Sequence, residues 1–287
     1  MTEVVRLWRG RVARATYVIV GAAFGLVVSL TSLHRGTQPW VVWACLAIAL
    51  AATSGAVFGY GLARWPEIRA LGRVRPSRVA GYITGIVVAG LVMLALGAVL
   101  RAFPDRDPSG VLEGELSGLL LVTFAWVGAL PVLAGLAAIH ELAHTMDGTP
   151  GEQLEDVLTL RRLLAGLLAA LGVQVTLETL ALGAALQLGS EPASAAVVIV
   201  FGVASSVVVG VAYAPANGAL RAAARALCRA VVPFSEVSPA DLPGRTEDRR
   251  RLEQALGVDR GLFADLQSGV IVLAPLLASA AAAFLPD

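Results

Sequence analysis

The sequence contains no lysine and little charge of any kind. Arginine supplies all 22 basic residues, and charged residues make up 15% of the chain, whereas they account for about 25% of a typical soluble domain. Hydrophobic residues make up 57%. This composition excludes an ordinary soluble domain and predicts that lipid is the solvent for most of the chain.

Other features are also missing, and each absence excludes a class of structure or function. Cys45 lies inside the second expected span and Cys228 on the expected cytoplasmic side, so no disulfide is expected between them, and the absence of a CxxC pair gives no indication of a cysteine metal site. A net charge of +1 gives no basis for a nucleic-acid partner. The apolar runs lack the period-two alternation of a membrane β-barrel. No small-residue cleavage site follows the first run, so we interpret it as a retained span and not a signal peptide.

Runs of about 20 apolar residues recur along the chain. A helix of this length crosses a hydrocarbon core about 30 Å thick, because it rises about 1.5 Å per residue. The sequence therefore predicts an all-α, polytopic helix bundle of about seven spans within a single membrane domain, residues 1–287. The count falls to six if the last run, which contains Pro275, is not a span. The expected spans are 15–33, 40–62, 79–100, 117–139, 163–187, 194–216 and 268–285.

The distribution of arginine predicts the orientation of these spans. Basic residues collect in cytoplasmic loops, and a cytoplasmic N-terminus places 19 of the 22 arginines on that side. Only Arg35, Arg101 and Arg106 fall outside. The lysine-free, alanine-rich composition is typical of a bacterium with a GC-rich genome. We therefore expect a multi-pass protein of the bacterial plasma membrane, in direct contact with the lipid bilayer.

Residues 217–267 are the only hydrophilic segment of any size, and they are expected on the cytoplasmic side. The helix of the sixth span is expected to continue over 219–232, and the prolines between 233 and 243 then break the chain. A second short helix is expected over 247–256, because acidic residues favour its start and Gly257 its end. The pattern predicts a cap or docking surface.

Glycines four residues apart recur in the expected spans. Such spacing lets helix backbones approach closely. We expect these pairs to pack helices within one bundle; a homo-oligomer built on the same glycines is the alternative. The pairs are Gly21 with Gly25, Gly55 with Gly59, and Gly81 with Gly85.

The motif His140-Glu141-Leu142-Ala143-His144 is the clearest chemical signal in the chain. Positions i and i+4 of a helix lie on one face, so His140 and His144 can converge on a metal ion, and Glu141 can reach a metal-bound water. Zinc would lower the pKa of that water, and Glu141 would accept its proton as the general base of peptide hydrolysis. A polar cluster at the membrane boundary, without metal, is the alternative interpretation.

This motif resembles the zinc-binding helix of membrane gluzincins and of site-2-type intramembrane proteases. The resemblance covers fewer than a dozen residues. It implies a third ligand, either a downstream glutamate or the aspartate of an LDG-type motif. The stretch Pro215-Ala216-Asn217-Gly218 has asparagine where that aspartate is expected, and an amide is a weaker zinc ligand than a carboxylate. The candidate third ligands are Glu152, Glu155, Asp156 and Asn217.

A second signal is a set of polar residues inside the fifth expected span: Gln174, Thr176, Glu178 and Thr179. An ionisable group at membrane depth costs at least about 2.5 kcal/mol and by default faces a cavity, a partner or a transport pathway. Glu178 lies about 22 Å along its helix from the cytoplasmic end, too far to join His140. Either the polar cluster satisfies itself internally, or it lines a route for ions or protons.

Three functions therefore follow from the sequence. The first is a zinc-dependent membrane peptidase that acts on a peptide or membrane protein at the cytoplasmic face, with His140 and His144 as ligands and Glu141 as base. The second is a channel, transporter or membrane effector with a polar route past Glu178. The third is a membrane scaffold that recruits partners through residues 217–267.

Overall fold

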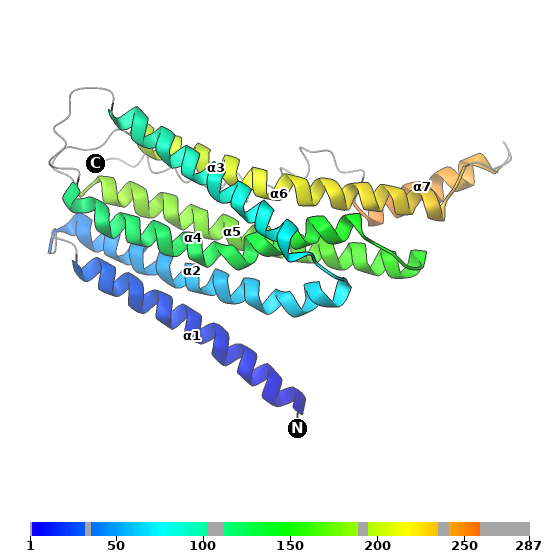
Figure 1. The fold of residues 1–287 in the computed structure, drawn as a ribbon, viewed down its shortest axis with the longest axis horizontal. Helices are drawn as coiled ribbons and strands as arrows, with labels where there is room; N and C mark the ends of the chain where they lie inside the picture. Colours follow the sequence, from blue (N-terminus) through cyan, green and yellow to red (C-terminus); the bar gives the residue numbers. More distant parts are fainter. Residues whose placement is uncertain (1, 32–35, 103–111, 189–194, 235–240, 259–287) are drawn as a thin grey trace.

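The computed structural model describes residues 2–31, 36–102, 112–188, 195–234 and 241–258, and within these ranges it contains seven helices and no strand. Figure 1 shows most of them running along the long axis of the molecule. The prediction of an all-α helix bundle is confirmed. The helices are α1 (Thr2–Thr31), α2 (Gln38–Leu71), α3 (Pro76–Ala102), α4 (Leu112–His144), α5 (Pro150–Leu186), α6 (Ala195–Val231) and α7 (Leu242–Ala255).

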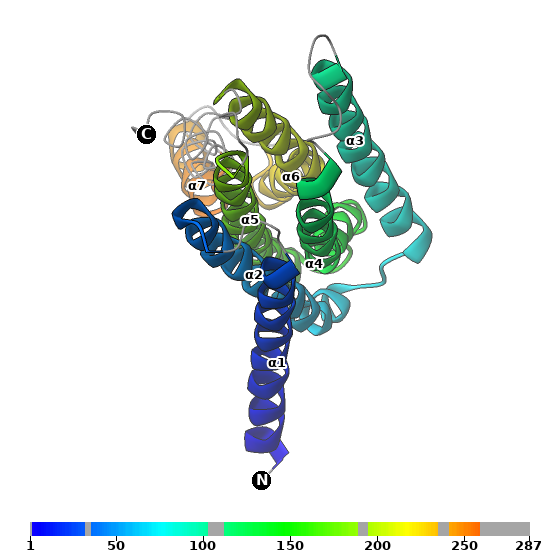
Figure 2. The same ribbon diagram turned by 90° about the vertical axis from the view of Figure 1, so that its left-hand side faces the viewer.

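Helices α2, α4 and α5 pack against one another and form the centre of the bundle. Helix α1 packs mainly on α2, and α6 packs on α4 and α5. Helix α3 contacts α4 and α6 and crosses them at an angle, so that its far end stands away from the other helices (Figures 1 and 2). The short α7 lies beside the end of α6.

Four helical segments are long and apolar enough to cross a membrane: Gln38–Leu71, Ser117–His144, Pro150–Leu186 and Val198–Val231. They coincide with four of the expected spans. Helices α1 and α3 cover the expected spans 15–33 and 79–100 without being among these four. The expected span 268–285 lies outside the described residues. The chain is thus built as a multi-pass membrane protein.

The outer surface of the bundle is apolar, as lipid contact requires. Large hydrophobic side chains on several helices are well exposed, among them Ile19 at 66%, Leu119 at 63% and Val173 at 56%. A soluble monomer rarely exposes contiguous apolar surface on this scale. The distribution supports a membrane environment independently of helix length.

Two helices begin earlier than the hydrophobic pattern indicates. Helix α5 begins at Pro150, 13 residues ahead of the expected span, because Thr149 and Glu152 form a capping box that starts a helix in polar sequence. Helix α7 begins at Leu242, not at residue 247. The expectation that Pro243 breaks the chain is wrong, because Pro243 lies in the first turn of α7, where its missing N–H costs nothing.

The two glycine pairs of the first spans pack α1 against α2. A Cβ atom built on Gly21 would lie 2.1 Å from the carbonyl oxygen of Ala51, and one on Gly55 would lie 2.1 Å from that of Tyr17. These positions therefore admit no side chain without moving a backbone. By contrast, a Cβ atom built on Gly81 or Gly85 of α3 would meet no atom of another described element within 4 Å.

One end of the bundle is rich in arginine. The end of α2 and the end of α4 meet there, since a Cβ on Gly72 would touch Leu142. The backbone N–H of Arg75, just before α3, donates to Glu141 near the end of α4. The arginines whose side chains are described lie toward this end or on α7. They are Arg64, Arg69, Arg73, Arg75, Arg78, Arg161, Arg162, Arg221, Arg225, Arg229, Arg245, Arg249, Arg250 and Arg251.

Candidate functional site

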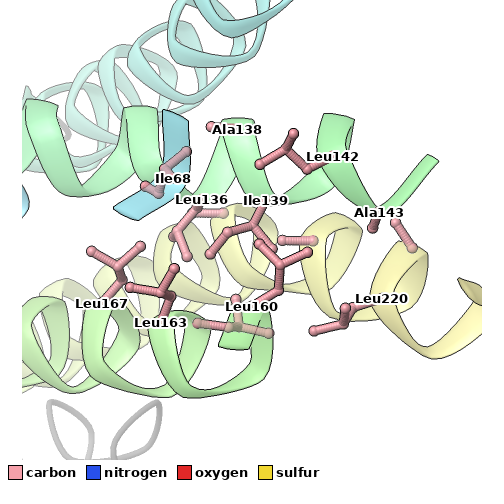
Figure 3. Close-up of a cluster of buried hydrophobic side chains, with 14 of the residues drawn as sticks. Ile68, Leu136, Ala138, Ile139, Leu142, Ala143, Leu160, Leu163, Leu167 and Leu220 are labelled. Atoms are coloured by element: carbon pink, nitrogen blue, oxygen red, sulfur yellow. The ribbon is translucent and has the colours of Figure 1, made fainter. Parts of the chain in front are cut away.

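The HELAH motif occupies the last turns of α4, at the arginine-rich end of the bundle. Its apolar residues fix the helix in the core: Ile139, Leu142 and Ala143 are buried. Figure 3 shows Ile139 facing Leu160 of α5, whereas Leu142 lies on the opposite side of α4, next to Gly72. The motif is therefore held in a single orientation by α5 and α6.

The two histidine rings lie together, as their spacing predicts. The ring centroids of His140 and His144 are 4.8 Å apart and the ring planes are nearly perpendicular, at 86°. Nδ1 of His140 lies 3.1 Å from the carbonyl oxygen of Pro215 on α6. Because a carbonyl only accepts, Nδ1 of His140 carries the proton, and its Nε2 is left as the acceptor. A metal-bound histidine commonly donates its other ring N–H to a carbonyl in this way.

Glu141 is turned toward another contact. Its side chain is 3% exposed, and its Oε2 accepts a hydrogen bond of 2.9 Å from the backbone N–H of Arg75. The carbonyl of Arg75 in turn accepts from the N–H of Val79 in the first turn of α3. A carboxylate at a helix N-terminus is favourable because it opposes the helix dipole. In this structure Glu141 thus anchors the start of α3 to the end of α4.

Among the described residues, the three acidic candidate ligands, Glu152, Glu155 and Asp156, form no metal-binding group with the histidine pair. Oε2 of Glu152 accepts from the N–H and Oγ1 of Thr149, within the capping box that starts α5. Glu155 is exposed and Asn217 is half-buried on α6. Within the described residues, no group of three His, Cys, Asp or Glu side chains could share a metal ion.

Asp156 lies at a small pocket between the ends of α2, α4 and α5. The pocket has a volume of about 60 Å³, and Asp147, Thr145 and Arg73 also line it. The pocket is large enough for a few waters at most, which makes it a poor site for a peptide substrate.

Tyr82 on α3 belongs to the same neighbourhood, and sequence reasoning missed it. Its hydroxyl donates to the carbonyl of Ala212 on α6, and its ring centroid is 6.3 Å from that of His140. Tyr82 and His140 thus bind α6 just before and at Pro215, which interrupts the helical hydrogen bonding because proline has no N–H. The sequence contains no direct signal for these contacts, because Pro215 leaves unpaired the carbonyl of Val211, four residues before it, and not those of Ala212 or Pro215.

The intramembrane polar cluster lies on α5, where α5 faces α2 and α4. Gln174, Glu178 and Thr179 are all buried, with exposures of 3%, 9% and 0%. Nε2 of Gln174 donates to the carbonyl of Ala125 on α4 at 2.5 Å. Oε1 of Gln174 has no hydrogen-bond partner within the described part of the chain. The amide of Gln174 therefore has a hydrogen-bond partner for its nitrogen and none for its oxygen in this part of the chain.

The hydroxyl groups of the cluster bond to their own helices. Thr176 donates to the carbonyl of Gly172 at 2.7 Å, and Thr179 donates to that of Val175 at 2.9 Å. On α2 the fully buried Ser54 donates to the carbonyl of Leu50 at 2.8 Å. Such bonds satisfy a hydroxyl without any other partner. These hydroxyl groups therefore do not donate hydrogen bonds to Glu178 or to the amide oxygen of Gln174.

Glu178 is the one carboxylic acid of the cluster. Among the described residues its carboxyl group makes no hydrogen bond and no ion pair. It follows Gln174 by four residues, so the two side chains lie on one face of α5. Further along that face, Ala181 and Ala184 pack in a core shared with α2 and α4. The carboxyl group thus lies inside the bundle, one turn from an amide oxygen that also lacks a partner.

Comparisons with protein-family models, with curated proteins and with solved structures found no match. The fold and contacts define a class, a multi-pass α-helical membrane protein. Within that class, the chain combines a histidine pair at one end of the bundle with a buried glutamate, Glu178, that has no partner among the described residues. Any narrower function must be inferred from the chemistry of these two places.

Proposed function

We propose that this chain is a membrane transport protein, a channel or a carrier, in which Glu178 binds a proton or a small monovalent cation on the transport route. The observation that supports this most is the burial of the Glu178 carboxyl group without a partner among the described residues. An unpartnered polar group costs about 1–3 kcal/mol when buried, and a charged one costs more. Such a cost is ordinarily maintained only where the group is used.

The neighbouring amide gives the carboxyl group two alternative states. When Glu178 is protonated it can donate to Oε1 of Gln174, which otherwise lacks a partner. When the proton leaves, three acceptor oxygens remain on one face of α5, two from the carboxylate and one from the amide, in a low-dielectric region that favours a compensating cation. Nε2 of Gln174, bound to the carbonyl of Ala125, keeps the amide oriented so that its oxygen stays available. The pair therefore suits exchange between a proton and a small cation.

We also infer that the arginine-rich end of the bundle faces the cytoplasm, since basic residues collect there in membrane proteins. This end includes Arg73 just before α3, Arg78 in the first turn of α3, and Arg161 and Arg162 on α5. The N-terminus is then cytoplasmic and the protein belongs to a plasma membrane. Glu178 lies 8 residues before the end of α5, about 12 Å along the helix, and is therefore nearer the opposite face.

Ion flux into liposomes tests the transport proposal. Purified protein is reconstituted, a proton or sodium gradient is imposed, and entry is followed with a dye inside the vesicles. We expect Glu178→Gln, which keeps the shape but cannot ionise, to slow the initial rate at least about tenfold, or ~1.4 kcal/mol in the barrier. Glu155→Gln, an exposed carboxylate at the start of the same helix, should leave the rate within about twofold. Equal rates for Glu178→Gln and wild type would reject the proposal.

A zinc-dependent peptidase is the second candidate function. Its support is the histidine pair, with centroids 4.8 Å apart and Nδ1 of His140 fixed on Pro215 so that Nε2 is available to a metal. Against it stands the contact of Glu141 with Arg75, which uses the carboxylate as a structural anchor. As a base, Glu141 would have to leave that contact.

The zinc content of the purified protein tests the peptidase function. If the motif is a zinc centre, purified protein carries one zinc per chain, as measured by elemental analysis, and His144→Ala removes it because the side chain is exposed and contributes only a ligand. His34→Ala, the one histidine outside the motif, serves as the control and should retain the metal. Protein that is free of zinc after purification without chelators, or equal metal content in both variants, would exclude the peptidase.

A further inference from the structure

Helix α7 is docked on the bundle by its C-terminal end. Leu256 is 1% exposed and joins the main core, where the fully buried Cys228 of α6 also lies. Gly257 adopts a φ of +56°, and a Cβ at this position would collide with the guanidinium group of Arg161 on α5. The polar segment 241–258 is thus held against α5 and α6, and side chains on α7 have fixed positions relative to α6.

A surface pocket lies between this docked helix and the end of α6. Its volume is about 480 Å³, and it is lined by Arg225, Arg229, Arg249, Glu253 and Val258. Three arginines from two helices therefore face one space, together with a single carboxylate. The pocket is polar, open to solvent and separate from both the histidine pair and the Glu178 cluster.

The charges in this pocket do not balance. Nε of Arg249 is 2.9 Å from Oε1 of Glu253, and its guanidinium carbon lies 5.0 Å from the ring centroid of Phe234. This pair and the aromatic ring hold Arg249 in place. Arg225 and Arg229 are exposed and make no ion pair among the described residues; the one bond recorded between them runs from Nε of Arg229 to the carbonyl of Arg225 at 3.4 Å. Within the described part of the chain, Arg225 and Arg229 thus place two positive charges without an ion-pair partner beside a pre-positioned third.

The helix dipole explains only part of this arrangement. Arg229 lies in the last turn of α6, where a cation is favourable. Arg225 is one turn further from the end, and Arg249 comes from a different helix, so neither is accounted for in this way. A convergence of guanidinium groups suits an oxyanion, because arginine presents paired N–H donors that match phosphate oxygens.

We propose that the pocket between α6 and α7 binds the phosphate group of a soluble phosphorylated compound, held by Arg225, Arg229 and Arg249. A lipid headgroup carries the same chemistry but does not reach the pocket. Arg225 and Arg229 follow Pro215 by 10 and 14 residues, which is about 15 and 21 Å of helix. The sixth expected span ends beside Pro215, and the interfacial layer beyond the hydrocarbon is only about 6 Å deep. The pocket therefore opens into the aqueous phase.

Calorimetric titration of the full-length protein in nanodiscs of neutral lipid tests this inference, with inorganic pyrophosphate as the probe. We expect saturable binding by the wild type and at least about tenfold weaker binding by the double variant Arg225→Gln, Arg229→Gln, because charge-assisted bonds to phosphate are lost. The matched control is Arg245→Gln, Arg250→Gln, which removes the same charge from exposed positions of α7 outside the pocket. It should bind within about twofold of wild type.

Three results would overturn the inference. Wild-type protein without saturable pyrophosphate binding would show that the pocket takes no soluble phosphate. Equal weakening in the two double variants would show that net charge, and not the pocket, attracts the anion. Binding that appears only when phosphatidate is added to the nanodiscs would assign the site to a membrane headgroup. Thermal unfolding of each variant in the same nanodiscs verifies that the fold is retained, as expected for exposed side chains.

Discussion

Replacing Gly55 by valine is expected to separate α1 from the rest of the bundle and to destabilise the protein by about 3 kcal/mol or more. A Cβ on Gly55 would lie 2.1 Å from the carbonyl oxygen of Tyr17, far inside van der Waals contact, and the atom it meets is backbone. No rotamer change can relieve that clash. Since α1 packs mainly on α2, the whole helix must move. The loss of stability is measured by thermal unfolding in detergent and by size-exclusion chromatography.

Gly81→Val is the matched control for this prediction. Both glycines lie inside apolar helices, and the substitution changes intrinsic helix propensity in the same direction at both. A Cβ atom built on Gly81 would meet no atom of another described element within 4 Å, so we expect an unfolding temperature close to that of wild type. Similar losses for Gly55→Val and Gly81→Val would contradict the packing of α1 on α2 through this glycine. A stable Gly55→Val variant would contradict it as well.

The membrane helices were the part of the fold that the sequence could predict. Apolar runs must match the thickness of the bilayer, so α2, α4, α5 and α6 follow directly from hydrophobic length. Helix ends outside the apolar runs could not be located in this way. The start of α5 depends on the exchange of hydrogen bonds between Thr149 and Glu152, and α7 starts where Pro243 suits a first turn. Both are decided by polar contacts that carry no hydrophobic signal.

The candidate metal site was predictable only where helix geometry fixes it. Spacing of four residues brings His140 and His144 together, and the structure has them in contact. The direction of Glu141 depends on the position of Arg75, 66 residues away in the chain. A motif of five residues contains no information about that contact. For the same reason, the role of the HELAH helix in joining α3, α4 and α6 could not be inferred from the motif.

The burial of Glu178 could be predicted from the sequence. Its lack of a hydrogen-bond or ion-pair partner among the described residues could not. An acidic residue within an apolar run must lie in the membrane, and its place on α5 follows. Whether it finds a partner depends on the helices that surround it. The side-chain amide of Gln174 donates one N–H to the carbonyl of Ala125, and its oxygen has no hydrogen-bond partner among the described residues. This pairing across helices is what turns a buried acid into a candidate ion site.

The state of the Glu178 carboxyl group can be observed directly by infrared difference spectroscopy of the reconstituted protein. A protonated carboxylic acid has a carbonyl stretching band that an ionised carboxylate lacks. In the proposed exchange, the protonated acid donates to Gln174 at low pH, and sodium displaces the proton as its concentration rises. Because the group is buried, its band should differ in frequency and in deuterium exchange rate from those of exposed acids such as Glu155.

The decisive comparison is between wild-type protein and Glu178→Gln, each titrated with sodium at constant low pH, with Glu155→Gln as control. We predict a buried carboxylic-acid band in wild type and in Glu155→Gln that declines as sodium is added, and no such band in Glu178→Gln. Identical difference spectra for wild type and Glu178→Gln would contradict the account, because Glu178 would then exchange no proton for a cation.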